Sequence, residues 1–258
     1  MTGKFQSIRN KASSAAFIVL LLAVWQAVSS AGLIPKFMLP SPVDVIFAFA
    51  GDFGELMSNA GTTLSEAFIG LGIAVALAFA LAFLMDRFDF LYRALYPVLI
   101  ISQTVPPVAI APLLVLWMGY GISPKITLVV IVCFFPVAVG LLDGYRAADT
   151  DTLNLLRAMG ATKVQIFRFL KFPSSLGRFF SGLRIAVSYS VVGAVIAEWL
   201  GGFSGLGVYM THVKKSFAFD KMFAVIFLVS VLSLVLMRIV SLAERLAMPY
   251  KRTGKNVK

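Results

Sequence analysis

Long stretches without charged residues alternate along this chain with short charged segments. Four uncharged stretches comprise residues 12–35, 67–85, 94–124 and 126–142, and two further apolar stretches, at about 179–200 and 222–243, contain only three charged residues, Arg184, Glu198 and Arg238. Most are close to the ~20 residues that a helix needs to cross a hydrocarbon core. Backbone groups in lipid must find partners within their own segment, which favours helices over strands. The pattern therefore predicts an all-α membrane protein with about six transmembrane helices.

Two of these stretches need further interpretation. Residues 12–35 follow three basic residues, as in a signal peptide, but the stretch is longer than a signal core, so a retained first span is favoured and a signal peptide remains the alternative. Residues 94–124 are long enough for one span plus a re-entrant or loop portion. This third stretch also contains Pro106, Pro107 and Pro112, each of which removes a helix donor. Such breaks favour a helix that faces the interior of the bundle.

Composition supports membrane insertion and predicts an orientation. Hydrophobic residues make up 59% of the chain and charged residues only 14%, whereas soluble proteins average roughly 25% charged residues. The net charge of +11 comes from basic residues that flank apolar runs, which predicts orientation in a membrane and no nucleic-acid partner. With the N-terminus inside, all but five of the 23 Lys and Arg residues lie on the inner side; the five are Lys36, Lys125, Lys214, Lys215 and Lys221.

This asymmetry predicts a multi-pass protein of the bacterial inner membrane with both termini and the loop 143–178 in the cytoplasm. The expected organisation has four parts. Residues 1–14 form a cytoplasmic N-terminal segment, and residues 15–57 form the first transmembrane helix and an outer loop. Residues 58–243 form the core domain, which includes the cytoplasmic loop 149–173, and residues 244–258 form a basic cytoplasmic tail.

Catalytic chemistry has little support in the sequence. The chain has one histidine, His212, and one cysteine, Cys133, so no catalytic constellation, metal site or cofactor is expected. No phosphate-binding Gly-x-x-x-x-Gly-Lys-Ser/Thr loop occurs, so the chain is not expected to hydrolyse ATP itself.

The loop 149–173 predicts two short helices around a glycine turn. Thr150 can cap the first helix, and Gly160 suits the left-handed position just after its end. Thr162 and Gln165 have the spacing of a capping box that starts the second helix, which is expected to end before Pro173. Physical chemistry leaves two roles open: an amphipathic connector in the headgroup region, or a docking element for a soluble partner.

Gly160, followed after nine residues by Leu170-Lys171-Phe172-Pro173, resembles the cytoplasmic signature loop of binding-protein-dependent ATP-binding-cassette permeases. The start of the loop departs from the family pattern, because Asn154-Leu155-Leu156 stands where the family has Glu-Ala-Ala. Residues 39–42, 109–113, 182–184, 197–198 and 205–207 resemble the branch for nitrate, sulfonate and taurine uptake. Residues 102–106, 133–136 and 215–217 look most like permeases for pyrimidine thiamine precursors or riboflavin.

The resemblance implies the permease subunit of a type I importer, with a coupling helix pair in the cytoplasm. It also implies cytoplasmic ATP-binding subunits, an extracytoplasmic solute-binding protein and a second permease copy, with a homodimer expected in the bilayer. The residues expected to couple to the ATPase are Leu153, Leu155, Leu156, Met159, Gly160, Ala161, Thr162 and Pro173.

Polar residues inside two spans are candidates for the translocation path, although hydrogen bonds within the bundle would explain each hydroxyl equally well. These candidates are Ser102, Gln103, Thr104, Ser188 and Tyr189. Glu198 precedes a glycine-rich segment and could either close the outer end of the path or contact the binding protein. An ion-coupled secondary transporter is the alternative function, but it would normally need ionisable residues in mid-membrane.

Overall fold

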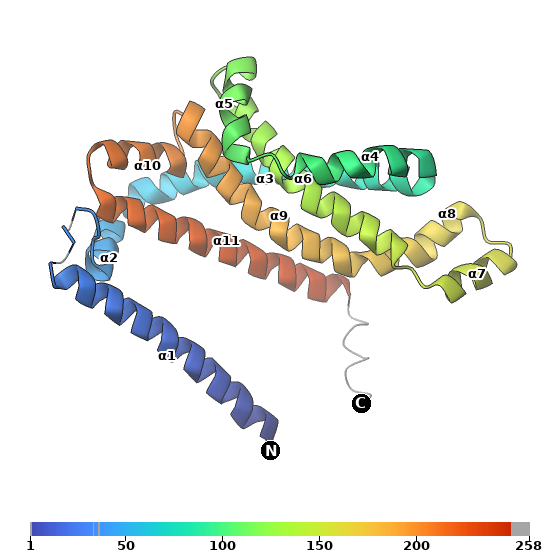
Figure 1. The fold of residues 1–258 in the computed structure, drawn as a ribbon, viewed down its shortest axis with the longest axis horizontal. Coiled ribbons are helices and arrows are strands. Elements are labelled where there is room, and N and C mark those ends of the chain that lie inside the picture. The colour runs from blue at the N-terminus through green and yellow to red at the C-terminus, as the bar shows by residue number, and fades with distance from the viewer. Residues whose placement is uncertain (1, 33, 36, 249–258) are drawn as a thin grey trace. The chain divides into compact units, whose positions relative to one another are not determined.

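A computed structural model describes residues 2–32, 34–35 and 37–248 and consists of helices joined by short connections (Figure 1). In chain order, the helices are α1 (Thr2–Ser30), α2 (Pro42–Gly51), α3 (Phe53–Arg87), α4 (Asp89–Ser102), α5 (Pro107–Met118), α6 (Ile122–Arg146), α7 (Thr150–Ala158), α8 (Lys163–Ile166), the π-helix η1 (Phe167–Lys171), α9 (Phe172–Gly201), α10 (Leu206–Lys215) and α11 (Phe219–Ala247). The all-α class predicted from the hydrophobic pattern is confirmed.

Within the described residues, four helical segments are long and apolar enough to cross a membrane: Phe53–Arg87, Ile122–Arg146, Lys163–Gly201 and Phe219–Ala247. α4 and α5 meet at a bend of 100° and make a fifth span if they are counted together, as expected for the long proline-containing stretch. The apolar part of α1, Ala16–Ser30, falls short of this length criterion. Of the six predicted spans, the described residues therefore contain four that are long and apolar enough, or five if the bent pair is one span.

The chain divides into two compact units. Unit 1 comprises residues 1–58 and 209–228, and unit 2 comprises residues 59–208 and 229–258. In unit 1, Trp25 stacks on Phe227 with ring centroids 5.9 Å apart. Also in this unit, Asp52 accepts hydrogen bonds from Lys221 and Tyr209, which hold the pKa of the Asp52 carboxyl below its usual value.

Unit 2 is built on close contacts between α6 and α9, and buried residues of α3 share their core. Ala74, Ala78 and Ala82 form a fully buried stripe on α3, where small side chains let the helix backbones approach closely. α6 runs along α9 (Figure 1). A Cβ at Gly182 of α9 would lie 2.2 Å from the carbonyl oxygen of Pro136 on α6, so only glycine allows this approach.

Candidate functional site

The loop between α6 and α9 begins with a capped helix. The side chain of Asp149 accepts a hydrogen bond from the backbone N–H of Thr152 at 2.9 Å, so the N-cap of α7 is Asp149 and not the predicted Thr150. An aspartate is a stronger N-cap than a threonine, and it lies one residue earlier. Hydrogen bonds from the Thr152 hydroxyl and backbone lower the pKa of the Asp149 carboxyl.

The end of α7 is a glycine turn, as the sequence predicts. Gly160 has φ +77°, in the left-handed region. Its N–H donates to the carbonyl of Arg157, and the N–H of Ala161 donates to the carbonyl of Leu156. This pair of bonds is a Schellman motif, which satisfies the last carbonyls of α7 and reverses the chain.

The second helix starts as predicted but does not end where expected. The Thr162 hydroxyl accepts from the Gln165 N–H while Gln165 Oε1 accepts from the Thr162 N–H, which completes a capping box. The prediction that this helix stops before Pro173 is wrong, because the helix continues through η1 into α9. The wider π turn, in which the Phe172 N–H bonds to the Phe167 carbonyl, accommodates a proline that has no N–H and would crowd a regular α turn.

Seven of the eight predicted coupling residues lie on two faces of α7 and at the turn after it, and the eighth, Pro173, lies in the first turn of α9. Leu155 and Met159 are spaced four residues apart on one face and are 60% and 73% exposed. Leu153 and Leu156 are half-buried. A helix face with two large exposed apolar side chains outside the spans is typical of a surface that a partner protein covers.

A second feature is a cavity of about 840 Å³ among α4, α5, α6 and α9. Three of the five predicted path residues line it: Ser102 and Gln103 at the end of α4, and Tyr189 on α9. Aromatic and aliphatic side chains such as Phe135 make up most of the remaining wall. Asp143 and Arg178 are the charged lining residues, and Arg178 donates a hydrogen bond to the Asp143 carbonyl at 2.9 Å.

The other two predicted path residues lie off this cavity. The Thr104 hydroxyl donates to the carbonyl of Ile101 at 2.8 Å, and the Ser188 hydroxyl donates to the carbonyl of Arg184 at 3.4 Å. Both hydroxyls make local bonds to backbone carbonyls of their own chain segment, as the Ser102 hydroxyl does to the Leu99 carbonyl.

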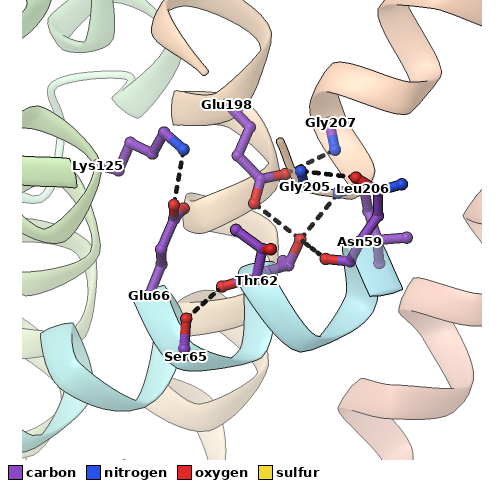
Figure 2. A network of polar contacts seen from close by, with 10 residues as sticks. Asn59, Thr62, Ser65, Glu66, Lys125, Glu198, Gly205, Leu206 and Gly207 are labelled. Atoms are coloured by element: carbon purple, nitrogen blue, oxygen red, sulfur yellow. Dashed lines mark hydrogen bonds and ion pairs between the residues drawn. The ribbon is translucent and has the colours of Figure 1, made fainter. Parts of the chain in front are cut away.

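A buried polar network joins α3, α9 and the start of α10 (Figure 2). Glu198 on α9 accepts from the Thr63 hydroxyl at 2.7 Å and from the Gly207 N–H at 2.6 Å. The Thr63 hydroxyl oxygen accepts in turn from the Leu206 N–H at 2.9 Å, and Asn59 accepts from the Gly205 N–H at 2.8 Å. Side chains of two other helices therefore cap the N-terminus of α10, which has no capping side chain of its own at Gly205.

Next to this network, Lys125 of α6 donates to Glu66 of α3 at 2.6 Å in a buried ion pair (Figure 2). The sequence-based prediction missed this pair, because both charges were interpreted as the ends of apolar runs. The available signal was their opposite sign and their position beside long apolar stretches. Glu198, which was predicted as a binding-protein contact, is only 2% exposed in the structure, where it accepts from the Gly207 N–H at the start of α10.

Comparison with known proteins gives consistent results. Residues 69–247 match the family described as binding-protein-dependent transport system inner membrane component. The chain is 35% identical over 238 residues to the formylaminopyrimidine transport permease protein ThiX of Halalkalibacterium halodurans, covering 92% of this chain and 94% of that protein. It is 30% identical over 231 residues to the riboflavin transport system permease protein RibX of Chloroflexus aurantiacus, covering 89% and 86%. The fold resembles the MetNI methionine ABC transporter in an inward-facing conformation, with a TM-score of 0.67 and 18% identity over 76% of this chain and 97% of that one.

Proposed function

The chain belongs to the family of binding-protein-dependent transport system inner membrane components and is the permease subunit of an ABC importer for small nutrients, and we propose that the cavity among α4, α5, α6 and α9 is its solute path. The family implies ATP-binding subunits and a solute-binding protein as partners. The cavity is the main support for this proposal, because Ser102, Gln103 and Tyr189 all line this one space between the spans. We place Thr104 and Ser188 beside the path, as residues that shape its helices.

The solute that fits this cavity best is a small, largely uncharged organic molecule. The wall offers aromatic faces at Phe135 and Tyr189 and hydrogen-bonding groups at Ser102 and Gln103. Its charged residues, Asp143 and Arg178, have opposite signs, so the lining has no net attraction for a free anion such as nitrate or a sulfonate. A pyrimidine thiamine precursor, of the kind named for ThiX, satisfies these requirements, and riboflavin is the next candidate.

We further propose that the loop 149–173 transmits the conformational change of the ATPase to the permease. The loop and both chain termini then lie on the cytoplasmic side of the membrane. Leu155 and Met159 of α7 insert into the ATPase, while Leu153, Leu156 and the turn at residues 160–162 hold that face in position. Because α8, η1 and α9 form one continuous helix past Pro173, a push on the loop is transmitted directly to α9, which lines the cavity. A second copy of this chain completes the membrane part, and the core domain at residues 58–243 carries both the path and the loop.

We propose that the glycine-rich loop that leads into α10, which Glu198 and Thr63 hold against α3 and α9, contacts the solute-binding protein on the outer side of the membrane. Glu198 holds the loop from behind rather than touching the partner, because its carboxylate is engaged with Thr63 and Gly207.

The test is uptake by proteoliposomes that contain this chain with its ATP-binding subunits and binding protein. We expect labelled formylaminopyrimidine to accumulate only when ATP and the binding protein are present. Uptake driven by an ion gradient without ATP would contradict the importer assignment. Uptake of taurine or nitrate in preference to the pyrimidine would contradict the solute class alone.

A further inference from the structure

A cavity of about 380 Å³ lies between the end of α3 and the α7–α8 loop, away from the solute path. Its lining combines four basic side chains with one acidic side chain. The basic residues are Arg87, Arg157, Lys163 and Lys171, and the acidic residue is Asp86. Lys171 donates to Asp86 at 2.6 Å, so this pair is internally neutral. Within the residues that the structure describes, no ion pair is recorded for the other three cations.

The same cavity has an apolar side. Phe83, Leu153, Val164, Ile166 and Phe167 contribute to its wall. Phe83 and Val164 are 43% and 71% exposed, so the apolar wall of the cavity extends onto the exposed surface of the protein. Phe83 belongs to the last turns of a spanning helix, whereas Arg87 follows one turn later at its end. The cavity therefore lies where the hydrocarbon region meets the headgroup region.

α7 separates this cavity from the face proposed for the ATPase. Leu153 and Arg157 are four residues apart and line the cavity, whereas the exposed Leu155 and Met159 point to the opposite side of the same helix. Docking of the ATPase on Leu155 and Met159 would leave the Arg157 side of α7 facing the cavity.

We propose that this cavity binds the phosphate headgroup of an anionic phospholipid such as phosphatidylglycerol, with the acyl chains on Phe83 and Val164. Three cations without an acidic partner match a phosphate diester, and basic pockets between helices at the cytoplasmic surface are known to hold such headgroups. The apolar wall favours a lipid over a free phosphate or an acidic protein segment. The proposal goes beyond transport itself, and it rests on the proposed function only for the cytoplasmic orientation of the loop.

The experiment is native mass spectrometry of the full permease with its partner subunits, released from detergent and titrated with phosphatidylglycerol, phosphatidylcholine or soluble glycerol phosphate. The wild-type complex should retain phosphatidylglycerol about tenfold more strongly than phosphatidylcholine, because the phosphatidylglycerol headgroup carries a net negative charge and the phosphatidylcholine headgroup is neutral overall. The double variant R157Q/K163Q should lose this preference. R238Q/R245Q removes two exposed charges from α11 and should keep it.

Arg87→Gln is a second variant, which lies on α3 and outside the loop. It should also weaken the retention of phosphatidylglycerol, and it keeps the test decisive if R157Q/K163Q does not assemble. Equal retention of the two lipids by the wild type, or an unchanged preference in R157Q/K163Q and Arg87→Gln, would overturn the proposal. Binding of soluble glycerol phosphate as strong as that of the lipid would overturn the assignment to a lipid.

Discussion

Lys125 and Glu66 form an ion pair at 2.6 Å in which the side chains are only 6% and 3% exposed. Lys125 lies in the first turn of α6 and Glu66 lies well inside α3, so the pair ties two spanning helices together. Removing one partner of a buried pair leaves the other charge uncompensated, which typically costs about 3–5 kcal/mol. We therefore expect Lys125→Met to lower the thermal unfolding midpoint of the detergent-solubilised protein strongly.

The exposed pair Arg93–Asp89, with side chains 81% and 69% exposed, supplies the control. Arg93→Met should change stability by no more than about 0.5 kcal/mol, because surface pairs contribute little. The double variant Glu66→Leu/Lys125→Met should recover much of the loss, since no buried charge remains. Equal midpoints for Lys125→Met and Arg93→Met would contradict the role of this pair.

The same pair explains a limit of the sequence-based prediction. Glu66 and Lys125 were interpreted as the ends of spans, because a single charge in lipid is unfavourable. In the structure α3 begins at Phe53, well before Glu66, and a cation from another helix compensates the Glu66 carboxylate. Pairing between residues 59 positions apart depends on tertiary structure, and hydrophobic runs do not report it.

Local signals gave more reliable results. The turn at Gly160 and the capping box at Thr162 and Gln165 depend on residues within a few positions of one another, and both predictions are confirmed. The helix end predicted at Pro173 is wrong, because a π turn before this proline keeps the helix continuous, and the sequence does not distinguish a π turn from a helix end. The cavity is lined by Ser102, Gln103 and Tyr189 but not by Thr104 and Ser188. Which polar side chains face the cavity depends on the rotation of each helix about its axis, and the polarity of the residues does not specify that rotation.

Thr63 connects Glu198 to the start of α10, since its hydroxyl donates to Glu198 and accepts from the Leu206 N–H. Thr63→Val keeps the shape but leaves the Leu206 N–H without its acceptor, which should cost about 1–3 kcal/mol. The exposed Ser65, whose hydroxyl donates to the nearby Thr62 carbonyl, is the matched control on the same helix. Thermal unfolding should separate Thr63→Val from Ser65→Ala, and indistinguishable midpoints would argue against a structural role for this network.

Gly160 tests the proposed coupling loop. Its φ of +77° is unfavourable for a β-branched side chain, so Gly160→Val should distort the turn between α7 and α8. We expect ATP-driven uptake and solute-stimulated ATP hydrolysis to fall sharply, while the chain still inserts and folds. Gly160→Asn should retain more activity, because asparagine tolerates the left-handed region. Gly72→Val, at a helical glycine with open space for a Cβ, should behave like the wild type. Full coupling in Gly160→Val would contradict the docking role of the loop.

Gln103 offers the sharpest test of the solute path, because among the described residues it is the one carboxamide that lines the cavity. Gln103→Leu keeps a similar side-chain volume but removes both hydrogen-bonding groups. Loss of one or two hydrogen bonds to the solute should raise the KM for uptake about three- to tenfold, with a smaller effect on ATP hydrolysis in the absence of solute. Ser241→Ala on α11 removes a hydroxyl that bonds to the Met237 carbonyl outside the cavity, and its uptake should match the wild type. An unchanged KM in Gln103→Leu would exclude this side chain from solute recognition, whereas equal losses in both variants would indicate a general effect on folding.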